Sequence, residues 1–350
     1  MKFADVLEIK NGRNQKQVEN PDGKYPIYGS GGIMGWADAY ICEADTVVIG
    51  RKGTINNPIY VDQPFWNVDT AFGLEAKRET LLPKYLYYFC CYFDFESLNT
   101  TVTIPSLTKA NLLNIEINVP LLDEQTQVIN KLDQVAELIS LRKKQISKLD
   151  QLVKSRFIEL FGDLASPECK WRKEKLVNAC ADPDDIKCGP FGTQLSKDEY
   201  RSDGVAVWEI PQINSRFSTI PTHYLSENKA KQLEAYSIKA GDIAMSRKGN
   251  VGKCAVFPSD FEAGIIHSDV LRIRVDSKRV LPVFMMHQLH YSGAVQHQIE
   301  LVSSGAIMAG INVTKLKQIL VHIPPLNLQT QFAAFVEQTD KSKFENLAVE

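Results

Sequence analysis

The sequence predicts an α/β (α+β) protein in which two similar domains with mixed sheets are joined by a long helix. Three observations support this prediction. One phrase, apolar-Pro-x-Leu followed by Gln-Thr-Gln, occurs as VPLLDEQTQV at 119–128 and as IPPLNLQTQF at 323–332. The apolar runs and glycine-rich turns ahead of the phrase also recur, about 200 residues apart. A heptad pattern follows the first phrase, and the regular βαβα alternation of a doubly wound sheet is absent.

Each predicted domain begins with short apolar runs typical of buried strands. An RKG triplet follows such a run at 51–53 and again at 247–249. Asp69 and Asp269 take matching places ahead of the next apolar run. Because the spacing between matching positions drifts and the period exceeds that of a solenoid unit, the pattern indicates a duplicated domain with loop insertions.

The connecting helix is predicted to begin after Pro120 and to end at Gly162. Asp123 and Glu124 lie in its first turn, where negative charge suits the helix dipole. Apolar residues then recur at alternating steps of four and three. The seam consists of Val128, Leu132, Val135, Ile139, Ile146, Leu149, Val153 and Leu160, with Arg142 and Arg156 at the interrupting positions. A seam of this length predicts a coiled-coil partner helix.

The helix predicted after the second phrase keeps this seam only briefly. The positions that it keeps are Phe332, Val336 and Thr339. Lys343 then falls where the first helix has Ile139, so the second helix is predicted to be short, or frayed beyond Asp340. The 24 residues at 327–350 compare with 41 at 123–163, and a natural short helix and a truncation both fit.

Composition narrows the class of protein. A hydrophobic content of 44% in 350 residues is enough for two buried cores, and no apolar run is long enough for a transmembrane helix. The charged N-terminal segment MKFADVLEIKNGR does not resemble a signal peptide, so the protein is expected to be cytoplasmic. Seven cysteines without a C-x-x-C pair indicate reduced thiols. Basic and acidic residues number 11 and 14 at 1–118 and 20 and 17 at 166–322, so DNA affinity would have to come from local patches.

The two RKG turns are the best candidates for contact with DNA. A glycine-flanked turn after a strand exposes backbone N–H groups, and adjacent Arg and Lys side chains can reach phosphates or a guanine edge. Side-chain amides close by can pair with adenine. The candidates are Arg51, Lys52, Thr54, Asn56 and Asn57 in the first copy, and Arg247, Lys248 and Asn250 in the second. The alternative is an ordinary solvated hairpin turn.

A glycine-rich segment in each copy is a second candidate. GSGGIMGW at 29–36 could cradle a phosphate with its amides, but it lacks the Gly-Lys-Ser/Thr ending of an ATP-binding loop. The matching segment of the second copy is GPFGTQL at 189–195, whose polar side chains could read base edges. The candidate residues are Ser30, Gly31, Gly32, Thr193 and Gln194. A plain strand connection is the alternative, and the polar loops at 100–103 and 303–305 are weaker candidates.

The second half of the long helix carries a basic stretch at 141–156, in which six Lys and Arg residues face Asp150 alone. Lys143, Lys144 and Lys148 are the candidates for contact with nucleic-acid phosphates or with an acidic partner protein. A solvated helix face is the alternative.

Motifs for catalysis and metal binding are incomplete. NPIY at 57–60 resembles the Asn-Pro-Pro-Tyr motif of adenine methyltransferases, but the second proline and a glycine-rich cofactor motif are missing. PDDIK at 183–187 compresses the two carboxylates of a nuclease motif into one turn. His287, His290 and His297 share a broad helical arc, which packed or surface histidines explain better than a metal site. No catalytic residue and no metal ligand is predicted.

Taken in order, these motifs resemble those of the specificity (S) subunits of type I restriction–modification systems. The shared features are the two helix starts with Gln-Thr-Gln and a lysine-rich heptad helix that ends in SRFIELFGDL. KYPIYGSGGIMGW and VVIGRKGTINNP in the first copy, and KCGPFGTQL and GDIAMSRKGNVGKC in the second, also match. Each motif alone is loose, whereas their order and spacing along the whole chain are specific.

The resemblance implies four parts. These are a target recognition domain at 1–118, a central conserved helix at 119–165, a second target recognition domain at 166–322 and a short C-terminal conserved helix at 323–350. Each domain would read one half of a bipartite target. The two helices, paired antiparallel as a coiled coil, would space the halves and dock modification subunits. A helix of about 38 residues is roughly 57 Å long, which equals the rise of roughly 17 base pairs.

By the same resemblance the chain is a DNA reader that is not itself an enzyme and holds no cofactor. The implied partners are double-stranded DNA, adenine methyltransferase subunits that use S-adenosylmethionine, and restriction subunits that use ATP and Mg, with no membrane involved. A short second helix would leave the stripe from Val128 to Ile139 uncovered within the chain, so a second copy (a homodimer) or a modification subunit is expected to cover it. A coiled-coil scaffold for other proteins, without DNA binding, is the alternative function. The target sequence and its spacer length cannot be predicted.

Overall fold

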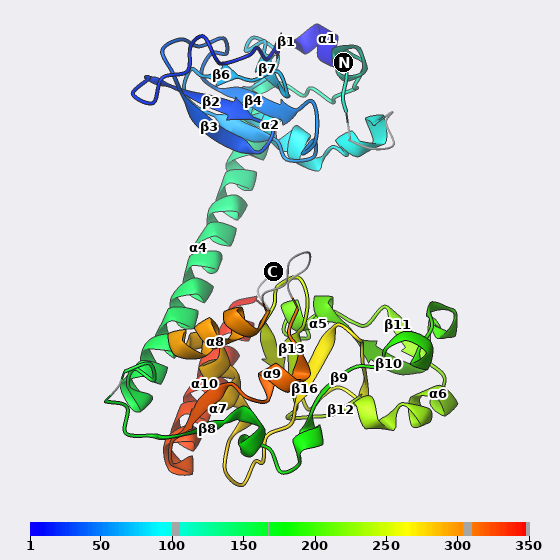
Figure 1. The fold of residues 1–350 in the computed structure, drawn as a ribbon. Helices are drawn as coiled ribbons and strands as arrows, with labels where there is room; N and C mark the ends of the chain where they lie inside the picture. The colour runs from blue at the N-terminus through cyan, green and yellow to red at the C-terminus, as the bar shows by residue number, and fades with distance from the viewer. Residues whose placement is uncertain (100–105, 167, 304–309, 348–350) are drawn as a thin grey trace. The chain divides into compact units, whose positions relative to one another are not determined.

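The computed structural model describes residues 1–99, 106–166, 168–303 and 310–347. The chain divides into two compact units, Met1–Leu141 (unit 1) and Arg142–Glu350 (unit 2) (Figure 1). Helix α4 (Leu122–Phe161) contributes its first half to unit 1 and its second half to unit 2. Within the described ranges, none of the helices has the length and apolarity needed to cross a membrane. The candidate loop at 100–103 and positions 304 and 305 lie outside the described residues.

The described residues of unit 1 form two sheets. The larger is antiparallel with strand order β1-β7-β4-β5, and the smaller, β3-β2-β6, pairs β2 with β6 in parallel. The strands are β1 (Leu7–Asn11), β2 (Tyr25–Gly29), β3 (Gly32–Ala37), β4 (Thr46–Gly50), β5 (Ile59–Val61), β6 (Trp66–Asn67) and β7 (Ala71–Ala76). The helices ahead of α4 are α1 (Phe3–Val6), α2 (Pro83–Tyr92), the 3-10 helix η1 (Phe95–Leu98) and α3 (Lys109–Leu113).

Strand β4 is buried at every position, because both faces of its sheet are covered. Val47 and Ile49 pack into a core shared with α1, α2 and α3, whereas Val48 packs on the opposite face against Phe65 and Tyr28. Burial on both faces explains why this strand reads as a continuous apolar run instead of an alternating one. The strand therefore gives the RKG turn that follows it a rigid base.

In the part of unit 2 that the structure describes, the strands form three sheets, ordered β14-β13-β16-β9, β11-β10-β15-β12 and β17-β8. The strands are β8 (Arg172–Lys175), β9 (Ile186–Cys188), β10 (Val205–Trp208), β11 (His223–Leu225), β12 (Ser237–Ile238), β13 (Ile243–Ser246), β14 (Cys254–Val256), β15 (Gly264–Ile266), β16 (Val270–Ile273) and β17 (Leu320–Ile323). The α-helices are α5 (Ile210–Asn214), α6 (Glu227–Gln232), α7 (Pro282–Tyr291), α8 (Gly293–Ser303), α9 (Val313–Leu316) and α10 (Leu326–Leu347). The 3-10 helices are η2 (Leu176–Ala179), η3 (Pro183–Asp185), η4 (Gly192–Gln194), η5 (Lys197–Glu199) and η6 (Glu234–Tyr236).

The two units repeat one plan. Strands β9, β16, β13 and β14 of unit 2 pair in the same antiparallel order as β1, β7, β4 and β5 of unit 1. Each unit also has a second sheet with one parallel pair, β2 with β6 and β10 with β15. The predicted fold class, with two similar mixed-sheet units and a long helix, is thereby confirmed.

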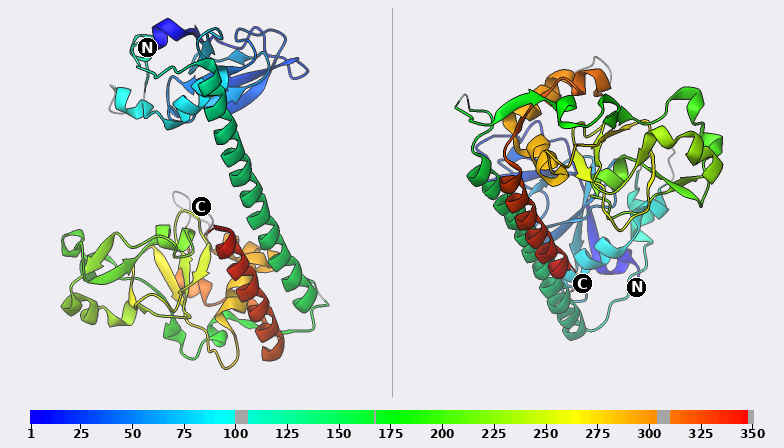
Figure 2. Two further views of the ribbon diagram at one scale, coloured as in Figure 1. Left: turned by 180° about the vertical axis from the view of Figure 1, so that it is seen from behind. Right: turned by 90° about the horizontal axis from the view of Figure 1, so that it is seen from below.

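The second half of α4 and α10 run antiparallel side by side (Figure 2). Phe157 of α4 lies 5.3 Å, centroid to centroid, from Phe332 near the start of α10, while Asp150 of α4 meets Lys343 further along α10. The helix ends at Gly162 as predicted, with φ +75° and its N–H bonded to the carbonyl of Ile158.

The predicted seam lies on the packed face of this half, because Val153 is buried and Ile146, Leu149 and Leu160 are partly buried, but it leaves out Phe157 and Phe161. The buried residues of α4 here are Val153, Phe157 and Phe161, spaced four apart, and Leu160 is only partly buried. Phe157 and Phe161 also pack against Phe284 of α7, so α4 contacts a helical layer as well as α10. A face that is wider than a two-helix seam explains why the heptad pattern did not include Phe157 and Phe161.

The second helix is short as expected, since α10 has 22 residues and α4 has 40, but Lys343 lies within it. Helix α10 continues to Leu347, and Lys343 is only 8% exposed. Its Nζ atom lies 2.9 Å from Asp150 and 2.8 Å from Asp340, so the buried charge is paired across and along the helices. The apolar pattern stops at this position because an ion pair takes its place.

The first half of α4 leaves a stripe of apolar side chains exposed. Val128, Leu132, Val135 and Ile139 are all exposed, whereas Ile129 on the neighbouring face is buried. The functional boundaries at residues 118, 165 and 322 stay predictions.

Candidate nucleic-acid interface

The RKG turn of unit 1 is held by the backbone on both sides. The N–H of Arg51 donates to the carbonyl of Thr70 (2.7 Å), and the carbonyl of Arg51 accepts from Leu107 (2.9 Å). Lys52 forms an isolated β-bridge with Ser106. The turn is therefore bound between the start of β7 and the segment ahead of α3.

Unit 2 builds the same frame. The N–H of Arg247 donates to the carbonyl of Asp269 (2.9 Å), the carbonyl of Arg247 accepts from Ile311 (3.1 Å), and Lys248 bridges to Gly310. Gly53 and Gly249 both have positive φ, +80° and +68°, which suits glycine. The duplicated motif is therefore a duplicated structure.

This frame corrects one sequence alignment. Asp269 takes the place of Thr70, since each accepts from the arginine N–H of its own turn. Asp69 corresponds to Ser268, because their carbonyls accept from the guanidinium of Arg51 (3.5 Å) and of Arg247 (3.4 Å). The predicted match of Asp69 with Asp269 was wrong by one residue.

Both arginines lie against an aromatic ring. The guanidinium of Arg51 is 5.7 Å from the centroid of Phe72, and that of Arg247 is 4.7 Å from Phe191. Arg247 also donates from Nε to the carbonyl of Ile311 (3.0 Å). A guanidinium has five N–H donors, so each orientation leaves donors for a phosphate or a guanine edge.

The two lysines differ in their electrostatics. Lys248 Nζ lies 2.8 Å from a carboxylate oxygen of Asp269, which offsets part of its charge. Lys52 is exposed beside Arg51. Both partners of this ion pair are half-buried, so Lys248 would turn to a phosphate at a greater cost than the exposed Lys52.

The candidate amides are not equivalent. Asn56 donates to Asp94 (2.9 Å) and accepts from the N–H of Phe95 (2.7 Å), so its amide holds the start of η1. Thr54, Asn57 and Asn250 are exposed. The geometry therefore favours Asn57 over Asn56 as the amide that faces a ligand.

The glycine-rich segment of unit 1 is a hairpin between β2 and β3, with Ser30 and Gly31 in its turn. This is the strand connection that was the alternative prediction. The hairpin tip nevertheless lies beside the RKG turn, since a Cβ added to Gly50 would come within 3.1 Å of Ser30 Cβ. Ser30, Gly31 and Gly32 thus share one surface with Arg51.

In unit 2 the matching segment forms η4. Thr193 is exposed, whereas the side-chain oxygen of Gln194 accepts from the N–H of Phe191 and from the hydroxyl of Tyr236, both at 3.1 Å. The ring of Phe191 brings this turn next to Arg247. Each unit therefore assembles its two candidate segments into one surface.

The helical lysines are placed differently. Lys143, Lys144 and Lys148 are exposed on the second half of α4. At 100° per residue, Lys148 projects opposite the face that carries Val153 and Phe157. It therefore points away from the packed face.

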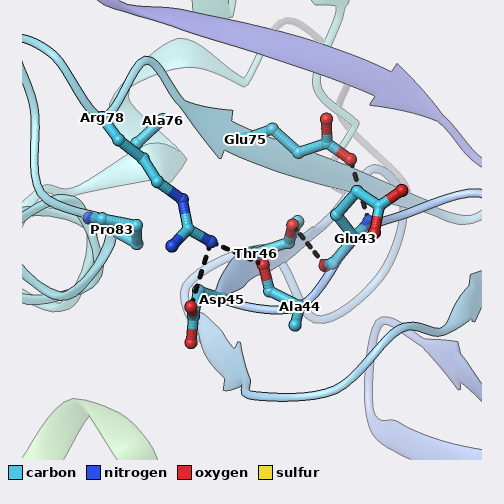
Figure 3. A pocket seen from close by; sticks show the side chains of 8 residues that line it. All are labelled: Glu43, Ala44, Asp45, Thr46, Glu75, Ala76, Arg78 and Pro83. Carbon is cyan, nitrogen blue, oxygen red and sulfur yellow. Dashed lines mark hydrogen bonds and ion pairs between the residues drawn. The ribbon is translucent and has the colours of Figure 1, made fainter.

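A hollow of about 340 Å³ in unit 1 is unsuited to DNA (Figure 3). Glu43, Asp45 and Glu75 line it, and Arg78 in the same lining lies 3.0 Å from the carboxylate of Asp45. An acidic surface whose arginine is already paired repels phosphates.

The glutamine that begins Gln-Thr-Gln has a role that the sequence analysis missed. Gln125 has no exposed surface, and its side-chain oxygen accepts from the N–H of Leu82, the N-cap of α2 (2.8 Å). Its Nε2 donates to the carbonyls of Thr80 (2.9 Å) and Pro120 (2.8 Å). One amide therefore joins the start of α2 to the start of α4.

Unit 2 repeats this clamp with Gln329. Its oxygen accepts from the N–H of Leu281 (2.8 Å), the N-cap of α7. Its Nε2 donates to the carbonyls of Arg279 (3.1 Å) and Pro324 (2.8 Å). The recurrence of the Gln-Thr-Gln phrase marked these glutamines as important. Their role could not be predicted because their hydrogen-bond partners lie at the starts of α2 and α7, far away in the sequence.

Unit 1 adds a second tie between α2 and α4. Lys84 Nζ lies 2.6 Å from the carboxylate of Asp133, which also accepts from the hydroxyl of Tyr88 (2.5 Å). The hydrogen bond from Lys84 is the main reason that the pKa of Asp133 lies below its usual value. The first half of α4 is therefore held against α2 within unit 1.

Comparison with known proteins shows which family the chain is similar to. A sequence model of the family described as "Type I restriction modification DNA specificity domain" matches residues 1–151 and 191–348. A provisionally named type I restriction enzyme specificity subunit of Haemophilus influenzae is 25% identical over 354 residues, covering 98% of this chain and 86% of that one. The type I restriction enzyme EcoBI specificity subunit of Escherichia coli is 21% identical over 345 residues, covering 90% and 70%.

A solved structure has the same fold. The type I restriction-modification system S subunit from M. genitalium matches with a TM-score of 0.59 at 16% identity, over 99% of this chain and 90% of that one.

Proposed function

The chain belongs to the family of type I restriction modification DNA specificity domains, and from this membership we propose that each of its units reads one half of a bipartite DNA target. The observation that carries the proposal is the RKG turn. Two units whose sequences have diverged keep one frame of backbone hydrogen bonds around Arg51 and Arg247. A frame kept in both units is expected where a positive side chain must be held at a constant place.

The surfaces around these arginines support the same proposal. Unit 1 gathers Arg51, Lys52 and the hairpin turn of Ser30. Unit 2 gathers Arg247, Lys248 and the turn that contains Thr193. Basic side chains supply phosphate contacts, and the polar groups beside them supply base contacts.

The helices complete the proposed arrangement. Helices α4 and α10 space the two readers and carry the docking sites for methyltransferase subunits. Lys143, Lys144 and Lys148 contact spacer phosphates or an acidic partner. The exposed stripe of Val128, Leu132, Val135 and Ile139 is covered by a modification subunit or by a second copy of the chain. S-adenosylmethionine, ATP and Mg act in the partner subunits, and this chain supplies no catalytic residue.

A domain exchange tests the proposal. The chain is produced with its methyltransferase subunits, and methylated adenines are mapped across the genome of the producing cell. Exchanging residues 166–322 for the corresponding segment of another family member is expected to change one half of the methylated motif and to leave the other half and the spacer intact. A change in both halves would refute the two-reader proposal. Methylation that does not depend on this chain would favour a scaffold without DNA binding.

A further inference from the structure

Phe191 is an exposed aromatic side chain in an otherwise polar turn. It is 45% exposed, and it lies between Pro190 and Gly192 in the segment next to the RKG turn of unit 2. A single exposed apolar residue is common on protein surfaces and carries no argument alone. The argument comes from how the turn and Arg247 hold this ring.

The backbone on both sides of Phe191 is constrained. A Cβ on Gly189 would lie 2.3 Å from the carbonyl oxygen of His267, so this backbone passes directly over the end of β15. Gly192 has φ +56°. Gln194 closes the turn, since its side chain accepts from the N–H of Phe191 and its own N–H donates to the carbonyl of Phe191, both at 3.1 Å. The turn therefore presents the ring outward instead of letting it fold into the core.

Arg247 occupies one face of the ring. Its guanidinium lies 4.7 Å from the ring centroid, and it is itself held by the carbonyls of Ile311 (3.0 Å) and Ser268 (3.4 Å). A cation–π contact of this kind orders both partners. The outer face and edge of the ring stay available beside the arginine.

Unit 1 has different apolar side chains in the corresponding place. Ile33 (57% exposed) and Met34 (62% exposed) follow the hairpin turn that lies beside the RKG turn. Arg51 stacks instead on Phe72, which is buried. Both arginines therefore have an aromatic neighbour, but the ring beside Arg247 is exposed to a ligand whereas the ring beside Arg51 is buried.

Resting on the proposed function, we infer that Phe191 is a base-reading residue of unit 2 that contacts the C5-methyl group of a thymine next to the base pair bound by Arg247. In the major groove the thymine methyl is the apolar feature of the base edges, and arginine prefers guanine O6 and N7. A ring that carries an arginine on one face fits a methyl group with its other face. Insertion between base pairs, the other use of an exposed Phe, needs both faces and would break the contact with Arg247.

Thymine-to-uracil substitution tests this contact, because uracil pairs normally but lacks the methyl group. The methylated motif first identifies the target. Duplexes with one uracil at each thymine position of either half-site are then titrated with the complex of this chain and its methyltransferase subunits. Burying one methyl group is worth about 0.8 kcal/mol, or roughly fourfold in affinity. We expect a roughly fourfold loss of affinity when uracil replaces one particular thymine. That thymine should lie in the half-site whose sequence changes when residues 166–322 are exchanged.

The variant Phe191→Ala provides the decisive comparison. It is expected to bind the thymine and uracil duplexes equally well, while Ile220→Ala, which alters another exposed apolar residue of unit 2, keeps the fourfold difference. If the Phe191→Ala chain still distinguishes correct from altered base pairs in the half-site read by unit 1, the variant is folded and assembled.

Three results would overturn the inference. The first is equal binding of thymine and uracil duplexes by the unaltered chain at every position. The second is a fourfold difference that survives Phe191→Ala. The third is a rise in 2-aminopurine fluorescence next to the contacted base pair, which would indicate insertion. Absence of any sequence-specific duplex binding by the unaltered complex would instead refute the proposed function.

Discussion

Replacing Gln329 by leucine removes a buried amide that makes three hydrogen bonds. The side chain has no exposed surface, accepts from Leu281 and donates to the carbonyls of Arg279 and Pro324. Leucine fills similar space but pairs with none of these groups. At about 1 kcal/mol for each net hydrogen bond, the free energy of unfolding of unit 2 should fall by about 3 kcal/mol. Gln125→Leu should destabilise unit 1 by a similar amount, because its three bonds match.

Urea unfolding of the full chain measures this loss. Because unit 1 and unit 2 have separate cores, we expect Gln125→Leu to lower the midpoint of one transition and Gln329→Leu that of the other. The phrase supplies its own controls, since Gln127 and Gln331 belong to the same two motifs but are exposed. Their replacement by leucine should change the free energy of unfolding by less than about 0.5 kcal/mol. Equal losses for the buried and the exposed glutamines would refute the assignment of the first Gln as a clamp.

Two further predictions concern charge. Burial lowers the pKa of His287 to about 4 from 6.5, so between these pH values the unfolded chain binds more protons than the folded chain. The free energy of unfolding of unit 2 should therefore fall by up to about 3 kcal/mol as the pH falls from 6.5 to 4. Urea unfolding at pH 7 and pH 4.5 should show a smaller fall in the free energy of unfolding for the variant His287→Phe than for the unaltered chain. Equal falls in the two proteins would contradict the reasoning. If Lys143, Lys144 and Lys148 contact DNA phosphates, their replacement by alanine should reduce the slope of log K against log salt by up to roughly 2.7 without altering the methylated motif. An altered motif would show that these lysines read bases.

Patterns with a local physical cause were predictable from the sequence. The long helix ends at Gly162 as expected, because a left-handed residue with a bonded N–H terminates a helix wherever it occurs. The RKG turns followed buried strands, and burial on both faces makes such strands continuously apolar. Duplication was visible because the same constraints act on both units.

Features that depend on distant partners were not predictable. The fate of the Asn56 amide depends on Asp94 and Phe95, and nothing near Asn56 in the sequence distinguishes it from Asn57. The phase of the α4 core depends on α7, which is why Phe157 and Phe161 were missed. A heptad pattern predicts packing against one partner helix, whereas the second half of α4 packs against both α7 and α10.

The two units share one fold but differ in the surface beside the RKG turn. What they share is backbone: the strand order, the hydrogen bonds around Arg51 and Arg247, and the glutamine clamps. What they do not share is the exposed apolar side chain in the segment next to each RKG turn, which is aliphatic at Ile33 and aromatic at Phe191. Because backbone bonds hold the arginine whatever the neighbouring side chains are, those side chains can change without loss of the frame. A repeated frame with different surroundings is therefore the arrangement expected if the two halves of the target differ in sequence.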